Sequence, residues 1–564
     1  MLSRAEAIEA LTSQGLFELT EDTSLGYPIR LYRNAPRALR DFFEGTRQHG
    51  DRTFLIYGEE TLTFAEHYGK VAALAHELIR RGVKKGDRVA IGMRNYPEWS
   101  ISFWACQAIG AIAVALNAWW TSAELAFALQ DSAPAALLID GERLERVRPL
   151  LGSLDLKAVI VARRGEAGDG GIDFQEVVAG PAEALPEVEV EPGDLATILY
   201  TSGTTGNPKG AMATQRNHVT NIMNSLLSGA VARAMAGLPD PDPAGPQPGA
   251  LQTFPFFHIG GLTGLCLSTL TGSKLAVMYK WAPVEAVQLV EKHRLNSVAG
   301  VPIVVRQLLH TASEMGADMS SIIGVASGGA PVPPDLIRRI GEQFQLRAAP
   351  GNGYGLTETT SAVIANGGAD YLAQPDSVGR PVPTADARVV GDDGREVAQG
   401  EIGEIWIRGP NVIPGYWRNP EATEAAFGGG WFRTGDLGYV DENGMYYVVD
   451  RKKDVIIRGG ENVYCAEVEA AILEIPGVRD VAVIGLPHPE YGEEVAAVVQ
   501  IGPDADERAM PDVIRRDLAE RLARFKMPTA IRISRDELPR TATGKLLKRE
   551  LKTTFGKSPA EGVS

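Results

Sequence analysis

YTSGTTGNPKG, at residues 200–210, directly follows the apolar run LATIL at residues 195–199. A short apolar run of this kind predicts a buried strand. The stretch that follows it combines glycines, hydroxyl side chains and one lysine. Glycines allow backbone N–H groups to approach an anion, hydroxyls add donors, and lysine adds positive charge. A strand that ends in such a loop predicts a binding site for the phosphates of a nucleoside triphosphate.

Two other phosphate-binding signatures do not match this chain. A P-loop needs Gly, four residues and then Gly-Lys-Ser/Thr, whereas here Pro208 precedes Lys209 and Gly210 follows it. The glycines of GNGYG at residues 351–355 have the wrong spacing for the dinucleotide loop Gly-x-Gly-x-x-Gly. Taken alone, residues 200–210 remain compatible with an ordinary flexible surface loop.

The composition is that of a globular protein and excludes several classes of function. The 564 residues are 44% apolar and 23% charged, which suits several packed layers and more than one domain. A net charge of −15 argues against nucleic acid as a partner, so an anionic substrate needs local basic groups. Cys106, Cys266 and Cys465 are far apart in sequence, which favours neither a disulfide framework nor a metal cluster and suits a reducing cytosol.

We expect a cytoplasmic protein without a transmembrane segment. Arg4, Glu6 and Glu9 interrupt any apolar run that would form a secretory signal. Residues 99–123 carry no charge and are long enough to span a bilayer. We interpret them instead as a helix at 99–108 and a buried strand at 111–116 of a globular core. Peripheral contact with a membrane and homodimer formation stay open.

The order of the predicted elements indicates the domain organisation. Strands alternate with helices over residues 51–160 and again from residue 194, which predicts parallel sheets covered by helices. From residue 378, short alternating strands separated by Asp-Gly and Asn-Gly turns indicate a small β-rich subdomain. After residue 450 Lys and Arg become frequent and the pattern changes to α+β, so we place a boundary at residues 450–453.

Further motifs follow one another along the chain: SGGAP at 327–331, GYGLTET at 353–359, TGD at 434–436, DRKKD at 450–454, GGEN at 459–462 and PRTATGK at 539–545. Together with residues 200–210, this ordered series resembles the acyl-adenylate-forming, or AMP-binding, superfamily, and within it the fatty-acid and other acyl-CoA synthetases. The resemblance covers nearly the whole chain.

This resemblance implies an α/β fold with a large N-terminal AMP-binding domain at residues 1–450, a hinge at 451–453 and a C-terminal domain at 454–564. The N-terminal domain would contain two α/β sheet subdomains and a small β-barrel-like subdomain. The C-terminal domain would be small, mobile and α+β, and it would turn about Lys453 between two half-reactions.

The implied activity is that of an ATP-dependent acid–CoA ligase, with ATP, Mg²⁺ and coenzyme A taking part. A carboxylate oxygen attacks the α-phosphorus of ATP, pyrophosphate leaves, and the acyl group then passes to the CoA thiol. Because the first two reactants are anions, catalysis needs charge neutralisation and in-line positioning. The resemblance assigns catalytic roles to Lys209, Thr357, Glu358 and Lys545, and it assigns Mg²⁺ to Glu358 and Thr204.

The remaining predicted site residues form two groups. Those that the resemblance assigns to ATP or AMP are Thr201, Ser202, Gly203, Thr204, Thr205, Gly206, Gly328, Gly329, Ala330, Pro331, Asn352, Gly353, Tyr354, Gly355, Asp436 and Arg451. Those assigned to the CoA and acyl channel are His258, Gly300, Gly459, Gly460, Arg524 and Lys526. Structural alternatives stay open for three of them: His258 as a helix cap, and Arg524 with Lys526 as an exposed basic helix end.

The acid itself is less well defined. Residues 259–263 contain no acidic side chain, which argues against an amino acid substrate, and the expected pocket wall at 298–305 is apolar. Gly300, Gly328 and Gly329 leave room for length, so we expect a medium- or long-chain fatty acid. An aryl or alicyclic acid, transfer to a free carrier protein, luciferase-like oxidation and a role for Trp119-Trp120 in core or surface stay open. Lys548 is expected to be solvated.

Overall fold

The structure, a computed structural model, describes residues 2–165, 171–180, 184–201, 208–239, 242, 245–330, 332, 334–344, 348–541 and 544–555. The chain forms two compact units. The first contains Met1–Ala387 and Ile407–Phe432, and the second contains Arg388–Trp406 and Arg433–Ser564. The predicted hinge at residues 451–453 lies inside the second unit and remains a prediction about movement.

The first unit contains an eight-stranded sheet that carries the predicted phosphate loop at one of its hairpins. Its order is β21 (Gly415–Tyr416), β11 (Lys209–Thr214), β10 (Leu195–Thr201), β6 (Ile112–Ala115), β5 (Arg88–Gly92), β7 (Ala136–Asp140), β8 (Ala158–Ala162) and β9 (Ile172–Asp173). The strands from β6 to β9 are parallel to their neighbours, as the alternation of strands and helices predicts.

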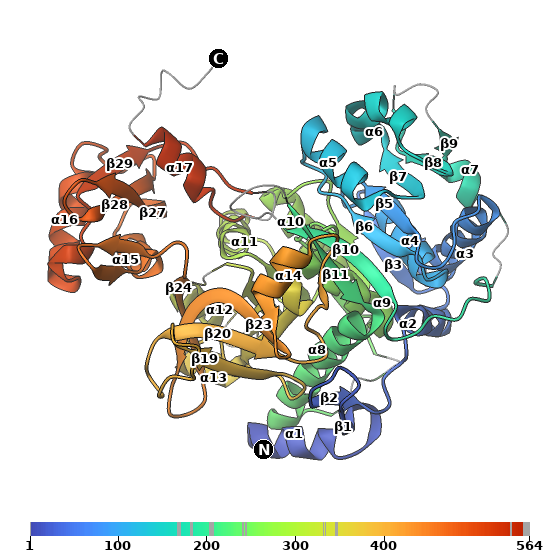
Figure 1. The fold of residues 1–564 in the computed structure, drawn as a ribbon, viewed down its shortest axis with the longest axis horizontal. Coiled ribbons are helices and arrows are strands. Elements are labelled where there is room, and N and C mark those ends of the chain that lie inside the picture. The colour runs from blue at the N-terminus through green and yellow to red at the C-terminus, as the bar shows by residue number, and fades with distance from the viewer. Residues whose placement is uncertain are drawn as a thin grey trace. The chain divides into compact units, whose positions relative to one another are not determined.

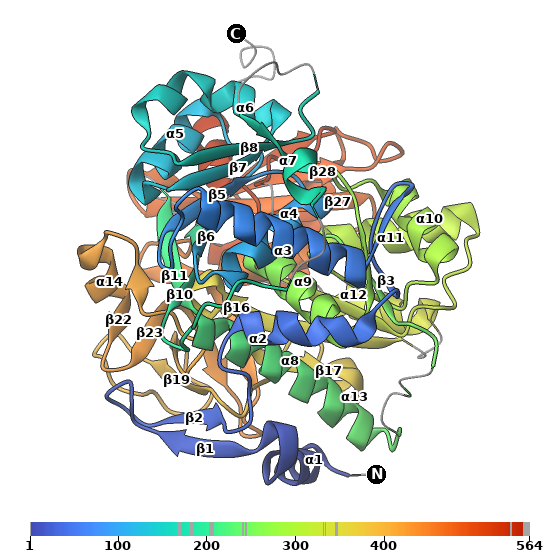
Figure 2. The ribbon, with the colours of Figure 1, turned by 90° about the vertical axis from the view of Figure 1, so that its right-hand side faces the viewer.

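Helices cover both faces of this sheet. Figure 2 shows α3 (Phe64–Arg80) and α4 (Pro97–Ala108) across one face, with α5 (Ser122–Ser132) and α6 (Gly141–Val147) on the other. Leu125, Leu129 and Leu144 of α5 and α6 pack with Leu137 of β7 in one buried cluster. The uncharged residues 99–123 are therefore a buried helix and strand, as predicted, and among the described residues no helix has both the length and the apolar character needed to cross a membrane.

A nine-stranded sheet completes the core of the first unit. Its order is β18 (Arg380–Pro381), β17 (Ser361–Gly367), β16 (Ala349–Leu356), β15 (Gly324–Gly328), β14 (Ser297–Gly300), β12 (Gly249–Gln252), β13 (Lys274–Val277), β3 (Thr53–Tyr57) and β4 (Glu60–Thr63). The helices associated with it are α8 (Gln215–Met235), α9 (Ile259–Thr271), α10 (Pro283–His293), α11 (Pro302–Met315) and α12 (Pro334–Gln343). Apolar residues of α10, α11 and α12 pack together with those of β12, β14 and β15.

The ends of the first unit are formed by shorter elements: α1 (Arg4–Thr12), β1 (Leu19–Asp22), β2 (Ile29–Tyr32), α2 (Leu39–Glu44), α7 (Phe174–Val178), α13 (Gly368–Ala373) and α14 (Pro420–Ala426). A five-stranded sheet follows β18 in the chain and comprises β19 (Asp386–Val390), β20 (Gly403–Arg408), β22 (Phe427–Gly428), β23 (Trp431–Val440) and β24 (Tyr446–Arg451). This sheet is the predicted β-rich subdomain, and three of its strands, β19, β20 and β23, cross the division between the units.

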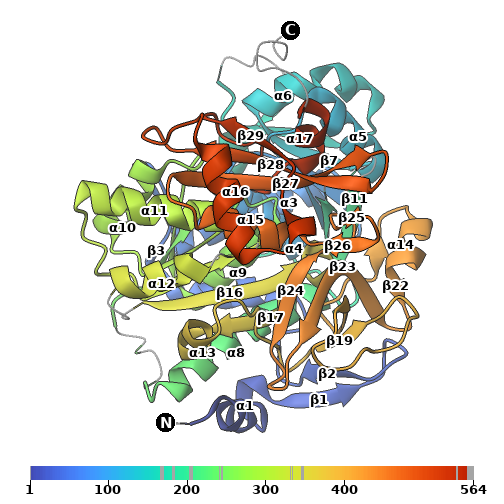
Figure 3. The same cartoon turned by 90° about the vertical axis from the view of Figure 1, so that its left-hand side faces the viewer.

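The second unit is an α+β layer, visible with its labels in Figure 1 and Figure 3. Its main sheet contains β26 (Glu461–Val463), β25 (Ile456–Arg458), β28 (Gly492–Ile501), β27 (Val478–His488) and β29 (Ala530–Ser534). Along β27, Val481 and Val483 pack against α15 (Cys465–Leu473) and α16 (Met510–Arg521), whereas Ala482 and Ile484 pack against α17 (Lys548–Thr554). The alternation is that of a strand buried on both faces. The predicted α/β fold class is confirmed.

Candidate active site

The predicted phosphate loop connects β10 to β11 in an antiparallel hairpin. Thr201, the last residue of β10, lies opposite Lys209, the first of β11, and its hydroxyl donates to the Lys209 carbonyl at 3.4 Å. The hairpin register therefore fixes the two ends of the loop. The predicted residues between them, Ser202, Gly203, Thr204, Thr205 and Gly206, lie outside the described residues, as does Pro331.

Tyr416 joins two predicted catalytic residues that are far apart in sequence. It is in β21, which pairs with β11 so that Tyr416 lies opposite Ala211. The Lys209 Nζ atom is 5.1 Å from the centroid of the Tyr416 ring, within cation–π range. On its other side, the Tyr416 hydroxyl donates a hydrogen bond of 2.8 Å to Glu358 Oε1. The structure thus brings Lys209 and Glu358 to one phenol, which the sequence motifs did not include.

Burial determines how this cluster behaves electrostatically. Tyr416 and Glu358 are both buried, with 7% and 9% of their surfaces exposed. Burial, followed by the neighbouring charge of Glu358, raises the pKa of the Tyr416 phenol, so the hydroxyl stays protonated and acts as a donor. A carboxylate that accepts a neutral phenolic hydrogen bond keeps its negative charge and gains a fixed orientation.

Glu358 fits a magnesium ion only if the nucleotide supplies most of the ligands. Among the described residues there is no group of three or more His, Cys, Asp or Glu side chains placed to hold a metal. Mg²⁺ commonly uses one or two protein carboxylates together with phosphate oxygens and water. A single oriented carboxylate beside a phosphate loop has the donor chemistry for that kind of site.

The turn that carries Glu358 has an unusual backbone. Thr357–Thr359 forms a short 3₁₀ turn, and the next two residues, Thr360 and Ser361, have φ angles of 49° and 85°. Left-handed backbone is unfavourable for a β-branched residue, and it persists only where the surroundings enforce it. Here the Asn411 side chain donates to the Thr359 carbonyl at 2.8 Å. The strain is located at the residues predicted to contact the α-phosphate and the metal.

Three of the predicted nucleotide glycines are required by close backbone packing. A Cβ atom on Gly355 would lie 1.9 Å from the Ser361 carbonyl oxygen, and one on Gly353 would lie 2.8 Å from Ala362 Cβ. Gly328 lies opposite Gly353 in the parallel pair β15–β16, and its Cβ would lie 2.9 Å from the Gly353 carbonyl oxygen. These glycines allow the strands to approach, which adds a structural reason to the predicted binding role.

The other predicted nucleotide residues of this unit lie beside these glycines. Asn352 and Tyr354 belong to β16, opposite Asn366 and Ile364 of β17. Gly329, with φ of 77°, follows β15 and precedes Ala330, the last described residue before the gap at 331. The motifs at 327–331 and 353–359 are therefore neighbours in space because their strands are neighbours in the sheet.

On the predicted acid side, His258 has the geometry of a helix cap. Its Nδ1 atom accepts a 3.2 Å hydrogen bond from the Gly260 N–H at the start of α9, and its ring stacks on Phe254 with centroids 5.8 Å apart. A Cβ on Gly300 would lie 3.0 Å from both Thr253 Oγ1 and a Val304 methyl carbon. The missing side chain at Gly300 is thus taken up by close neighbours, so it does not by itself leave room for a long acyl chain.

In the second unit, Asp436 and Arg451 form the predicted ribose-binding pair. They lie opposite each other on β23 and β24, and Arg451 Nε is 3.1 Å from Asp436 Oδ1. Asp436 is almost fully buried, whereas 41% of the Arg451 side chain is exposed. Gly435, with φ of 71°, makes the turn that places Asp436, and Lys453 lies in the turn that follows Arg451. The two residues that the motifs selected are therefore in contact.

Lys545 lies on a tight turn that Thr541 closes. The Lys545 N–H donates to Thr541 Oγ1 at 3.1 Å, and the Thr541 N–H donates to the Lys545 carbonyl at 2.8 Å. Gly544, at φ of 82°, makes this turn possible. The preceding Arg540 is held by Asp480 at 2.5 Å, so the base of the turn is anchored to β27.

The predicted CoA residues of the second unit have unequal surroundings. Gly459 and Gly460, with φ angles of 61° and 89°, form the turn between β25 and β26. Lys526, in the short turn Arg524–Lys526, donates to both carboxylate oxygens of Glu467 at 2.7 Å. An ion pair of this kind reduces the charge that Lys526 offers to a phosphate.

The expectation that Lys548 is solvated is wrong. Its side chain is only 20% exposed, and its Nζ atom lies 2.8 Å from Glu469 Oε1. Burial opposes the charge, but the neighbouring charge of Glu469 outweighs it and raises the pKa of Lys548. Sequence position among other basic residues suggested solvent exposure, whereas helix α17 directs this side chain to a buried carboxylate.

The comparison with known families follows the same order as the motifs. The model of the AMP-binding enzyme family matches residues 42–417, and the model of the AMP-binding enzyme C-terminal domain matches residues 467–545. A feruloyl-CoA synthase of an Amycolatopsis species is 36% identical over 531 residues, which are 94% of this chain and 98% of that protein.

Two further relatives extend the comparison. A long-chain-fatty-acid–CoA ligase of Bacillus subtilis is 32% identical over 539 residues, covering 89% of this chain and 91% of that protein. The solved structure of the o-succinylbenzoate–CoA synthetase of Bacillus subtilis, in complex with ATP and a magnesium ion, has a TM-score of 0.75 at 30% identity and covers 91% of this chain and 99% of its own. The predicted resemblance and the predicted enzyme class, an acid–thiol ligase, are confirmed.

Proposed function

Because this chain belongs to the family of AMP-binding enzymes, we propose that it is an ATP-dependent acid–CoA ligase acting on an aryl carboxylic acid. The observation that carries the proposal is the contact of Lys209 and Glu358 with the same buried phenol of Tyr416, directly beside the hairpin of the phosphate loop. A cation and a carboxylate held next to a Gly/Ser/Thr loop suit the triphosphate of ATP and a metal ion bound to it.

In the first half-reaction, an acid oxygen bonds to the α-phosphorus of ATP and the bond to pyrophosphate breaks. Lys209 would neutralise charge on the departing phosphates, and Thr357 would donate to the α-phosphate. Lys545 would approach the two anions from the second unit, where Asp436 and Arg451 would hold the ribose hydroxyls. Magnesium, when bound at Glu358, would supply further positive charge to the phosphates. In the second half-reaction the CoA thiol bonds to the acyl carbon and AMP leaves.

The proposal for the acid departs from the fatty acid expected from sequence. The feruloyl and o-succinylbenzoate enzymes act on acids with an aromatic ring, and the first has higher identity to this chain than the fatty-acid ligase has. Gly300 is closely packed, and the stacked rings of Phe254 and His258 offer flat surfaces to a planar substrate. These features favour an aryl acid over a long flexible chain.

The test is ATP–pyrophosphate exchange, measured with a panel of aryl acids and of medium- and long-chain fatty acids. Thioester formation is then measured with CoA and, separately, with a free carrier protein. We expect exchange to be fastest with an aryl acid and thioester to form only with CoA. Fastest exchange with a fatty acid would overturn the proposed substrate, and no exchange with any acid would overturn the ligase activity.

A further inference from the structure

The feature concerned lies at the carboxyl end of β5 in the first unit. In the eight-stranded sheet β5 lies between β6 and β7, and all three strands are parallel. The chain therefore leaves β5 to one side for β6 and returns to the other side for β7. In open α/β sheets, ligands bind outside the carboxyl ends of the strands at such a switch point. Arg94 follows the end of β5 here, and Trp119 follows β6.

Arg94 is a buried guanidinium with unused donors. Only 9% of the residue is exposed, and among the described residues its Nε and Nη1 atoms have no hydrogen-bond partner. Its guanidinium carbon lies 3.6 Å from the centroid of the Trp119 indole and 5.0 Å from that of Tyr279. A buried charged donor that lacks a partner is costly, so its retention at a switch point indicates a role outside the fold.

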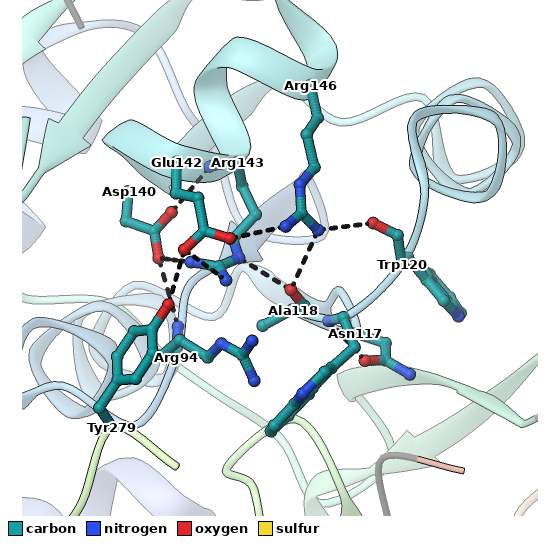
Figure 4. A network of polar contacts seen from close by, with 10 residues as sticks. Arg94, Asn117, Ala118, Trp120, Asp140, Glu142, Arg143, Arg146 and Tyr279 are labelled. Carbon is teal, nitrogen blue, oxygen red and sulfur yellow. Dashed lines mark hydrogen bonds and ion pairs between the residues drawn. The ribbon is translucent and has the colours of Figure 1, made fainter. Parts of the chain in front are cut away.

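The acidic side chains near Arg94 are already paired, as Figure 4 shows. Asp140 is held by Arg143 at 2.7 Å. Glu142 is held by Arg146 at 2.6 Å and accepts a 2.6 Å hydrogen bond from the Tyr279 hydroxyl. Two carboxylates and two other arginines therefore balance one another. The charge of Arg94 is left over, and this end of the sheet has a local positive charge in a chain of net charge −15.

The same arginines also hold the segment that carries Trp119. Arg143 Nε donates to the Ala118 carbonyl at 2.8 Å, and Arg146 Nη1 donates to the Trp120 carbonyl at 2.8 Å. The backbone on either side of Trp119 is thus fixed. Trp120 is buried, whereas Trp119 is 40% exposed, so the paired tryptophans have different environments. The result is a half-exposed indole on a rigid support, with a cation against its ring.

This indole adjoins the predicted acid side of the site. The Trp119 ring makes an edge contact with Phe257, with centroids 5.5 Å apart at an angle of 69°. Asn95 joins the two regions, because its side chain donates to the Phe254 carbonyl at 3.0 Å and accepts from the Phe256 N–H at 2.8 Å. Phe254 to Phe257 follow β12, which lies between β13 and β14 and is the switch point of the second sheet.

We propose that Trp119 and Arg94 form a binding site for the nucleotide end of coenzyme A, with the adenine stacked on the Trp119 indole and its phosphates attracted by Arg94. Trp119 would contact the ligand, and Arg94 would position the ring and supply charge. The proposal rests on the proposed function, in which CoA is the second substrate. A half-exposed surface ring suits a ligand that arrives from solvent, and aromatic platforms bind bases of any sequence by stacking. Lys526, the predicted nucleotide contact elsewhere in the chain, is occupied by Glu467.

The test is equilibrium binding of adenosine 3′,5′-bisphosphate, the nucleotide end of CoA, and of CoA itself, by isothermal titration calorimetry. Trp119→Ala is expected to raise both dissociation constants about tenfold, the usual order of magnitude for loss of one stacked base. Trp119→Phe should retain most of the affinity because it keeps an aromatic face. Ile323→Ala, at a residue of the same unit that is 61% exposed, is the control and should bind as the wild type does. Arg94→Gln should weaken binding and flatten its dependence on salt, which a purely structural role would not do.

ATP–pyrophosphate exchange without CoA separates this proposal from the proposed function. Exchange by Trp119→Ala at the wild-type rate, with weakened binding of the bisphosphate, is the supporting result. Unchanged affinity in Trp119→Ala, or wild-type protein that binds CoA but not the bisphosphate, would overturn the site. A higher KM for the acid with unchanged affinity for CoA would also overturn it, because the ring would then belong to the acid pocket.

Discussion

Replacing Tyr416 by phenylalanine removes one hydroxyl from the centre of the candidate site. The ring that contacts Lys209 is retained, but Glu358 loses the 2.8 Å hydrogen bond that orients its Oε1 atom. A hydrogen bond to a charged group contributes about 1.5–3 kcal/mol. If that orientation is needed in the transition state, the same energy corresponds to a decrease in rate of roughly 10- to 100-fold. ATP–pyrophosphate exchange at saturating acid measures this decrease.

Tyr68→Phe is a matched control for this experiment. The Tyr68 hydroxyl donates to Glu44 Oε2 at 2.7 Å, so the same kind of bond is removed between two helices, α2 and α3, that carry no predicted site residue. Both variants should lower the stability of the fold by a similar amount, and only Tyr416→Phe should slow exchange. Wild-type exchange in Tyr416→Phe, or an equal decrease in the two variants, would refute the role given to the Tyr416–Glu358 bond.

Three other outcomes are expected. His218 is buried against Thr197 of β10, and its burial lowers its pKa to about 4, so stability that is present above pH 6.5 is lost as the pH falls toward 4, by roughly 3 kcal/mol; urea unfolding should show a shallower loss in His218→Gln. Lys548→Met should destabilise the second unit by about 3 kcal/mol because Glu469 is left buried without its cation, and adding Glu469→Leu should restore much of that loss in thermal unfolding. Lys545→Ala should abolish pyrophosphate exchange but spare thioester formation from supplied acyl-adenylate, and an equal loss of both half-reactions would contradict its role.

The sequence was sufficient where a function uses contiguous residues. Phosphate loops and ribose-binding turns depend on backbone conformation, so their glycines and hydroxyl residues occur together in the chain. Asp436 and Arg451 were selected as a pair from two such motifs, and the hairpin β23–β24 places them opposite each other. The alternation of strands and helices likewise predicted the sheets, because it depends on periodicity over short windows.

The sequence was insufficient where a contact depends on strand order. Tyr416 is 58 residues from Glu358, and only the pairing of β21 with β11 brings it to Lys209. No local pattern distinguishes this tyrosine from a core residue. Arg94 and Trp119 show the same limit, since their stacking results from the neighbouring positions of β5 and β6. Lys548 was misjudged for a related reason: its carboxylate partner is on another helix.

The position of Tyr416 between Lys209 and Glu358 explains why a phenol is suited to this site. A lysine and a carboxylate in direct contact would neutralise each other, and each would then have less charge to offer a phosphate or a metal ion. The Tyr416 ring instead holds Lys209 through its face, and the Tyr416 hydroxyl holds Glu358 through its edge, without cancelling either charge. Tyr416→Ala would remove this separation, and the two side chains should then form an ion pair. That variant should therefore lose more exchange activity than Tyr416→Phe. Equal activity of the two variants would show that the ring has no separating role.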